Sequence, residues 1–335
     1  MPERTGAHTI TLSSRPTILG YAAVVGKKEG EGPLGAYFDK IFEDTRLGES
    51  TWEKAESRLQ QEALNCALNK AGYSPSQLQM LFTGDLLNQN TASTFGMRGM
   101  GVPLLNQFGA CSTMAQTLLL ATVFVDSGAA DVAAAVTSSH FCTAERQFRF
   151  PLEYGGQRPS TSQWTATASG AVVVGLGGGR VHITDVCAGR IVDFGITDTN
   201  NMGAAMAPAA ADTLRRFLSD THTRPDDYDF IATGDLGAEG SALFKTLMAR
   251  EGNRLSDNYF DCGLLLYDRT RQDVHAGASG CGCSASVLCG HILKRMEAGE
   301  WNNGIFMATG AMMSPTSSQQ GESIPGLAHL IHLTA

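Results

Sequence analysis

The chain has 335 residues, 43% of them hydrophobic, and a formal net charge of −8. This length supports a sizeable core and about two domains, and the acidic balance without a long basic run argues against a nucleic-acid-binding surface. No stretch approaches the ~20 uninterrupted apolar residues of a membrane span, and the polar first residues lack the apolar segment of a secretory signal. We therefore expect a soluble chain that is not exported, whose eight irregularly spaced cysteines are reduced thiols.

The predicted elements repeat along the chain. A capping box at Ser50 and Glu53 opens a helix whose apolar residues recur at helical spacing over 52–71, and a strand follows over 78–83. This strand runs into the sequence Thr-Gly-Asp-Leu at residues 83–86. The same four residues recur at 233–236, after a helix over 209–218 and a strand over 228–233. A repeated motif in a repeated structural context indicates an internal duplication.

A second pair of segments supports the duplication. Gly-Ala-Cys-Ser at 109–112 precedes an apolar helix over 114–125 and a strand over 133–137, and Gly-Cys-Ser at 282–284 opens a helix to 296 and a strand over 305–309. Three glycines at 177–179 mark the joint, so we predict an N-terminal half over 1–179 and a C-terminal half over 180–335. Alternating strands and helices, several apolar on all faces, predict α/β sheets covered on both sides. We expect the two halves to stack as five layers, α-β-α-β-α.

Cys111 stands at the first turn of the apolar helix over 114–125. Unpaired backbone N–H groups and the positive end of the helix dipole favour a thiolate there, which is how a chain presents a nucleophile or an anion site. A structural explanation competes, because free cysteines are often buried as small hydrophobic residues and an apolar pocket raises a thiol pKa.

Six segments together resemble the stage V sporulation protein AD family, a branch of the thiolase superfamily. The resemblance implies a thiolase-like fold and a protein of the SpoVA machinery, which moves dipicolinic acid (pyridine-2,6-dicarboxylate, with calcium) into the developing spore and releases it in germination. It also implies a dipicolinate-binding protein without enzymatic activity, peripheral at the spore inner membrane beside other SpoVA membrane proteins, and a homodimer as thiolases usually are. The segments that carry it are 85–90, 108–113, 143–149, 153–157, 206–212 and 279–284.

The catalytic partners that thiolases use are not evident. Thiolase chemistry needs a His in a Gly-His-Pro turn and a second Cys near the C-terminus. An ungapped alignment puts Ser279 in the place of that His, and the segment containing Met313 in the place of the Cys-Gly-Gly-Gly sequence. A gapped alignment would allow His275, and His140 follows the strand after the Cys111 helix. We therefore expect binding rather than catalysis. Two alternatives remain: an acyltransferase of the thiolase or ketoacyl-synthase type with Cys111 as nucleophile, and a structural scaffold of the transport complex.

The segment 140–158 has the composition expected of a site for a planar aromatic dianion. Arginines, which grip carboxylates bidentately, alternate with aromatic rings that can cover a flat ligand. The same arginines could instead pair with Glu145 and Glu153 in an interface or cap loop. The residues concerned are Arg146, Arg149 and Arg158 with Phe141, Phe148, Phe150 and Tyr154.

Each Thr-Gly-Asp-Leu turn contains one acid, Asp85 or Asp235, which can cap backbone N–H groups at the end of its strand. Asp85 has an alternative role: it could line the pocket beside Cys111 together with the neutral Asn88 and Gln89. Calcium or a proton would then have to offset the negative charge of Asp85 next to a dianion. The candidate ligand-binding residues are Cys111, Asp85, Asn88, His140, Arg146, Arg149, Tyr154, Arg158, His275, Ser279 and Cys281.

We expect no metal centre and no cofactor. Cys-x-Cys at 281–283 followed by Cys-x-His at 289–291 matches no common zinc spacing, so close packing of small residues where helices cross explains these thiols better. The glycines at 175–179 form no dinucleotide-binding motif, and no P-loop occurs.

Overall fold

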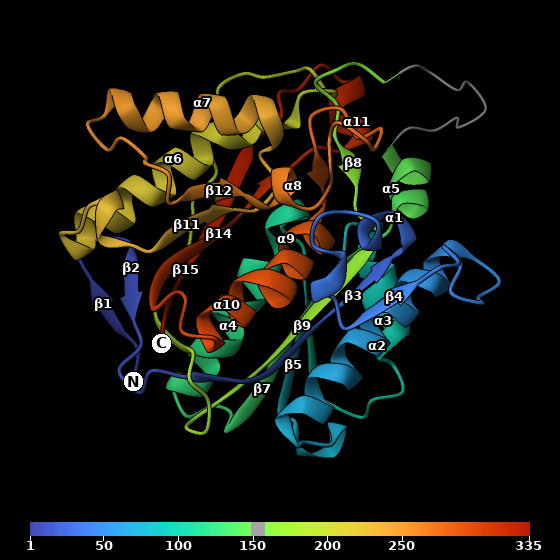
Figure 1. The fold of residues 1–335 in the computed structure, drawn as a ribbon, viewed down its shortest axis with the longest axis vertical. Coiled ribbons are helices and arrows are strands. Elements are labelled where there is room, and N and C mark those ends of the chain that lie inside the picture. Colours follow the sequence, from blue (N-terminus) through green and yellow to red (C-terminus); the bar gives the residue numbers. More distant parts are fainter. Residues whose placement is uncertain (149–157) are drawn as a thin grey trace.

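A computed structural model describes residues 1–148 and 158–335 of the chain. Five layers follow one another across the molecule, with helices outside, two sheet regions, and buried helices between them (Figure 1). This confirms the predicted α/β thiolase-like architecture.

The strand order shows the duplication directly. Hydrogen bonds connect the strands in the order β12-β11-β14-β15-β10-β3-β9-β7-β5-β6, and the halves meet at a β10–β3 pairing of His182 with Thr17. Outward from that junction each half has two antiparallel pairings followed by two parallel ones. The strands of the first half are β3 (Thr17–Gly26), β9 (Ala168–Gly175), β7 (Val132–Ser139), β5 (Met80–Gly84) and β6 (Leu104–Gln107); those of the second are β10 (His182–Cys187), β15 (Gly326–Thr334), β14 (Asn303–Ala311), β11 (Phe230–Thr233) and β12 (Tyr259–Asp261).

Three hydrophobic clusters hold the layers together. The central cluster combines the inner faces of both sheet regions with α4 (Thr113–Asp126), α9 (Cys281–Val287) and the π-helical turn that leads from α9 into α10 (Leu293–Glu297). The outer clusters lie under α2 (Trp52–Ala71) on one side and under α6 (Met202–Thr221), against which α7 (Gly237–Arg250) packs, on the other. Because α4 contacts both sheet regions, it is apolar on nearly all faces, as its sequence predicts.

The helices end at residues of the types that the sequence predicts, but some of them begin at other positions than predicted. The side chain that caps α2 belongs to Thr51, which accepts a hydrogen bond from the N–H of Lys54, so the expected capping box at Ser50 is wrong by one residue. Gly72 ends α2 with a left-handed φ of 75°, which glycine adopts without strain. In the second half α6 begins at Met202, earlier than the apolar run suggests, because Asn201 caps it and Pro208 is accommodated within it.

The remaining elements are short strands and helices around the sheets. A hairpin of β1 (Glu3–Thr5) and β2 (Thr9–Thr11) extends beside β10, and β4 (Lys40–Phe42) pairs with β3. The short strands β8 (Trp164–Thr165) and β13 (Ala278–Ser279) pair with each other, one from each half. The short helices are α1 (Lys27–Gly30), α3 (Thr91–Met97), α5 (Phe141–Phe148), α8 (Cys262–Leu265) and α11 (Pro315–Gln319).

Three further expectations concern the cysteines, membrane-spanning helices and the boundary between the halves. All eight cysteines are free thiols. Within residues 1–148 and 158–335, none of the helices has the length and apolar character needed to cross a bilayer. The predicted boundary at residues 179 and 180 falls in the connection between β9 and β10.

Candidate functional site

Cys111 lies on a tight turn between β6 and α4. The preceding residue, Ala110, has a φ of 50°, in the left-handed region that is uncommon for a residue with a side chain. The turn is held by Ser112 Oγ, which donates to the carbonyl of Gly109 at 2.7 Å, and by Thr113 Oγ1, which donates to that of Ala110 at 2.6 Å. Its backbone is therefore fixed by the residues that flank the thiol.

The second half packs directly on this turn. A Cβ added to Gly310 of β14 would lie 2.3 Å from the carbonyl oxygen of Gly109, so only glycine allows this approach. The contact brings Cys111 to the carboxyl ends of the strands of the opposite half, where ligands of open α/β sheets bind.

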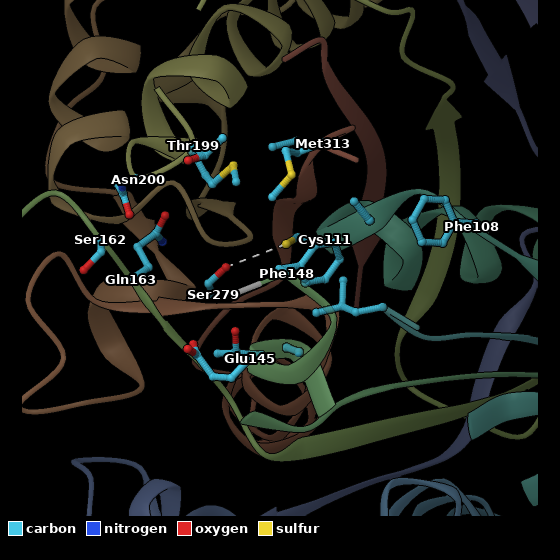
Figure 2. A pocket seen from close by; sticks show the side chains of 16 residues that line it. Phe108, Cys111, Glu145, Phe148, Ser162, Gln163, Thr199, Asn200, Ser279 and Met313 are labelled. Atoms are coloured by element: carbon cyan, nitrogen blue, oxygen red, sulfur yellow. Dashed lines mark hydrogen bonds between the residues drawn. The ribbon is translucent and has the colours of Figure 1, made fainter. Parts of the chain in front are cut away.

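Ser279 and Asp235 are the polar groups behind the thiol. Cys111 Sγ lies 3.8 Å from Ser279 Oγ (Figure 2). The Ser279 hydroxyl in turn donates to Asp235 Oδ2 at 3.4 Å. Asp235 also accepts hydrogen bonds from the N–H of Gly280 at 2.8 Å and from Thr309 Oγ1 at 3.0 Å. Ser279, which the ungapped alignment puts in place of the thiolase His, is thus the side chain that faces Cys111.

Burial governs the protonation of these groups. It raises the pKa of Asp235 to about 7. Burial, with the Asp235 carboxyl close by, holds the pKa of the Cys111 thiol well above its usual range. The helix terminus therefore does not produce a thiolate at neutral pH, because desolvation and a neighbouring acid outweigh it.

A cavity of about 170 Å³ opens above Cys111 and Ser279. This is close to the ~150 Å³ cavity that accommodates a benzene ring in an engineered protein core. Neutral polar side chains gather on one side of it, among them Ser162, Gln163 and Asn200 (Figure 2). The lining residues are Leu86, Phe108, Ala110, Cys111, Ala144, Glu145, Phe148, Ser162, Gln163, Thr165, Thr199, Asn200, Met202, Ser279, Ala311 and Met313.

Glu145 on α5 is the charged group among the described lining residues, and Arg158 binds it. Arg158 also donates to the carbonyl of Gln163 at 3.4 Å and lies over the rings of Phe141 and Trp164, at 5.1 and 4.7 Å from their centroids. Those two rings stack with centroids 3.9 Å apart. Of the two roles that the sequence allows for Arg158, the structure shows the ion pair with Glu145, at the wall of the cavity.

Arg146 and Asn88 lie elsewhere. They line a separate, more open depression of about 260 Å³, with Glu53, Leu87, Thr91, Thr143 and Gln147. Arg146 pairs with Glu53 of α2 and lies 5.7 Å from the centroid of the Trp52 ring. The structure does not bring these two predicted residues to Cys111.

Asp85, unlike Asp235, is occupied as a turn cap. Its carboxylate accepts hydrogen bonds from the N–H of Leu87 at 2.8 Å, from the N–H of Ser93 at 2.7 Å and from the Ser93 hydroxyl at 2.6 Å. Asp85 therefore caps the turn, and it is not among the residues that line the cavity beside Cys111.

The two histidines considered as bases are engaged away from the thiol. His140 is buried, with Nε2 2.7 Å from the carbonyl of Thr45 and Nδ1 accepting from the N–H of Cys142 at 3.1 Å, and burial lowers its pKa. His275 Nε2 lies 3.4 Å from Asp273. Neither histidine lines the cavity.

Cys281 is buried behind the site and donates to the carbonyl of Ser138 at 2.9 Å. Its neighbours Cys283 and Cys289 likewise donate to main-chain carbonyls. Over the described ranges, no group of three or more His, Cys, Asp or Glu side chains is arranged to hold a metal ion. Arg149 and Tyr154 fall outside the described residues.

Sequence reasoning did not assign Asp235, Gln163 or Asn200 to the site. The Thr-Gly-Asp-Leu repeat points to Asp235 as much as to Asp85, but only the packing of the halves shows which copy meets Cys111. No sequence signal marks Gln163 or Asn200, which lie on irregular segments at the cavity edge.

Comparisons with known proteins agree with this architecture. The sequence profile of the family described as Stage V sporulation protein AD (SpoVAD) matches residues 6–334. Stage V sporulation protein AD of Bacillus subtilis (strain 168) is 44% identical over 325 residues, which covers 97% of this chain and 96% of that protein. The chain belongs to the SpoVAD family.

Solved structures similar to this SpoVAD family member are thiolase-like. An acetyl-CoA acetyltransferase from Syntrophomonas wolfei aligns with a TM-score of 0.60 at 11% identity, covering 95% of this chain and 98% of that one. A 3-oxoacyl-[acyl-carrier-protein] synthase III from Aquifex aeolicus VF5 aligns with a TM-score of 0.56 at 13% identity, covering 96% and 100%. At these identities the likeness establishes the fold alone.

Proposed function

We propose that this SpoVAD family member is a non-enzymatic sporulation protein that binds dipicolinic acid, taken with calcium, in the cavity beside Cys111. One observation carries the proposal: the thiol faces Ser279 and Asp235 rather than a histidine, at the floor of a cavity that fits one six-membered ring. Neutral polar side chains at the cavity edge can donate hydrogen bonds to carboxylates, and Phe148 offers an apolar surface to a ring.

The charge of the cavity favours calcium as part of the ligand. Among the described lining residues no cation faces the ligand, and the charge of Glu145 is matched by Arg158, so the neutral chelate with Ca²⁺ suits this cavity better than a free dianion does. Carboxylate and amide oxygens are the ligands that calcium prefers, and Glu145 and Asn200 supply them around one cavity.

Calorimetric titration of the full chain tests the proposal. Dipicolinate is added with and without calcium, and benzene-1,3-dicarboxylate and benzoate serve as controls that lack the ring nitrogen or one carboxylate. We expect saturable binding of dipicolinate and much weaker binding of both controls. No preference for dipicolinate would contradict the proposal.

A second candidate function rests on the turn itself. The strained Ala110 and the helix that starts after Cys111 resemble the arrangement of a nucleophile, and an acyltransferase acting on acyl-CoA would use it. That reading requires covalent labelling of the wild-type chain by acetyl-CoA, lost in Cys111→Ser. A purely structural scaffold for the transport complex would show neither labelling nor dipicolinate binding.

The proposed assembly is a homodimer that associates peripherally with the spore inner membrane through other SpoVA proteins. Strand β6 ends the strand order, and the apolar Leu105 on it and Phe95 and Phe108 beside it are each more than 40% exposed. An exposed edge strand with apolar neighbours favours pairing with a second copy. Sedimentation equilibrium tests the dimer, with Leu105→Lys expected to shift it to monomer.

A further inference from the structure

Asp235 is a fully buried acid directly behind the cavity floor. It adjoins two floor residues: Ser279, whose Oγ lies 3.4 Å from Asp235 Oδ2, and Cys111, whose Sγ lies 3.8 Å from that hydroxyl. The titratable groups that influence it among the described residues are all acids: Cys111 on the turn before α4, Cys281 and Cys283 on α9, and Asp261 and Cys262 where β12 meets α8. A carboxyl in these surroundings gains little by being charged.

The hydrogen-bond donors around Asp235 differ from those around the other buried acids of the sheet ends. Asp85 and Asp261 each accept from two backbone N–H groups, whose direction is fixed. Asp235 accepts from one, that of Gly280, and its next partner on the same oxygen is the Ser279 hydroxyl, which can either donate or accept. The surroundings of Asp235 therefore accommodate both a carboxylate and a carboxylic acid.

The proton on Asp235 sets the direction in which Ser279 points its hydrogen. When Asp235 is ionised, the Ser279 hydroxyl donates to it and presents only lone pairs to the cavity, which repel an anionic carboxylate. When Asp235 is protonated, it donates to Ser279 Oγ, and the Ser279 hydrogen is free to turn towards a ligand. A carboxylate at the cavity floor thus favours the protonated form.

We propose that binding of a carboxylate ligand at Ser279 takes up one proton, which Asp235 holds. The inference rests on the proposed ligand site and deepens it, because it makes occupancy of the cavity depend on pH as well as on ligand concentration. Asp235 is here a positioning residue that acts through Ser279 and does not itself touch the ligand. Burial raises its pKa to about 7, so the transition falls near neutral pH.

The test is calorimetric titration of the full chain with dipicolinate, without calcium, in two buffers of different ionisation enthalpy such as phosphate and Tris. Dipicolinate is fully ionised between about pH 6 and pH 9, so a proton taken up in that range comes to the protein. We expect uptake to approach one proton per ligand above about pH 7, with affinity falling about tenfold per pH unit there.

Two variants locate the proton. Asp235→Asn is neutral and cannot take up the proton, so it should bind dipicolinate with no proton uptake and an affinity independent of pH. Ser279→Ala breaks the link, and should bind more weakly and also without uptake. Wild-type binding without proton exchange, or a pH dependence that persists in Asp235→Asn, would overturn this inference alone. No binding at any pH would overturn the proposed function and this inference with it.

Discussion

Glu56 gives the sharpest prediction about how the site is supported. It lies on α2, fully buried beneath α5, and its two oxygens contact Ser138 Oγ at 3.0 Å and Thr143 Oγ1 at 2.6 Å. Thr143 Oγ1 also lies 2.9 Å from the carbonyl of His140, so its single hydrogen faces two acceptors, that carbonyl and Glu56 Oε2. A proton on Glu56 that is donated to Thr143 Oγ1 satisfies both contacts.

The magnitude follows from the pKa of this group. Burial, and the nearby negative charge of Asp85, raise the pKa of Glu56 from 4.5 to about 8. Between these two pH values the unfolded chain releases the proton and the folded chain keeps it, so stability falls as pH rises through this window and the full cost is present above about pH 8. This difference in pKa between the folded and unfolded chain lowers the free energy of unfolding by about 5 kcal/mol above pH 8.

The substitution Glu56→Gln removes that cost while keeping both hydrogen bonds, because the amide oxygen accepts from Ser138 and the amide nitrogen donates to Thr143. We expect the variant to be more stable than the wild type by a few kcal/mol at about pH 8 and equally stable near pH 4.5. Urea unfolding at a series of pH values measures this. Glu62→Gln, on the surface of the same helix, is the control and should keep the wild-type dependence. A Glu56→Gln protein that loses stability at pH 8, or keeps the wild-type slope, would refute the reasoning.

Three further predictions follow from the cavity. The raised pKa of Cys111 makes its alkylation by iodoacetamide at neutral pH slower than that of a free thiol such as glutathione; a faster reaction, followed by mass spectrometry, would indicate an activated thiolate. Glu145→Gln removes one negative charge from the cavity wall, so that the Arg158 charge is no longer offset by Glu145; this variant should bind calcium-free dipicolinate a few-fold more tightly and lose any gain from calcium, and unchanged calorimetric affinities would argue against Glu145 as a neighbour of the ligand. Asp85→Asn should lower the free energy of unfolding in urea by about 1 to 3 kcal/mol, because an amide cannot accept all three hydrogen bonds that the carboxylate receives. Asp235→Asn should lower this free energy less, since the amide oxygen can keep the bonds from Gly280 and Ser279 while the amide nitrogen donates to the rotatable Thr309 hydroxyl; an equal loss in both variants would contradict the difference drawn between the two acids.

The duplicated fold could be predicted because its signals are local. Each half carries its own Thr-Gly-Asp-Leu strand end and its own buried helix that opens with small residues, and these determine the elements without knowledge of their packing. The sequence predicts the N-cap of α2 one residue early because Ser50 and Thr51 are both good capping residues, and only the backbone conformation distinguishes them.

The site was less predictable because it forms between segments far apart in the chain. Asp85 and Asp235 stand in identical motifs, and only the close approach of Gly310 to the Cys111 turn brings the C-terminal copy to the thiol. Arg146 is diverted by Glu53 on α2, a partner that no local pattern reveals. Ser279 was found because the alignment to the thiolase turn is itself local.

The central claim is that dipicolinate occupies the cavity beside Cys111. Calorimetric titration of a matched pair of variants tests it most directly: Asn200→Phe fills that cavity, whereas Asn88→Phe fills the separate depression beside Arg146. The account predicts that Asn200→Phe abolishes dipicolinate binding while Asn88→Phe binds as the wild type does. Retained binding in Asn200→Phe, or its loss in Asn88→Phe alone, would contradict it.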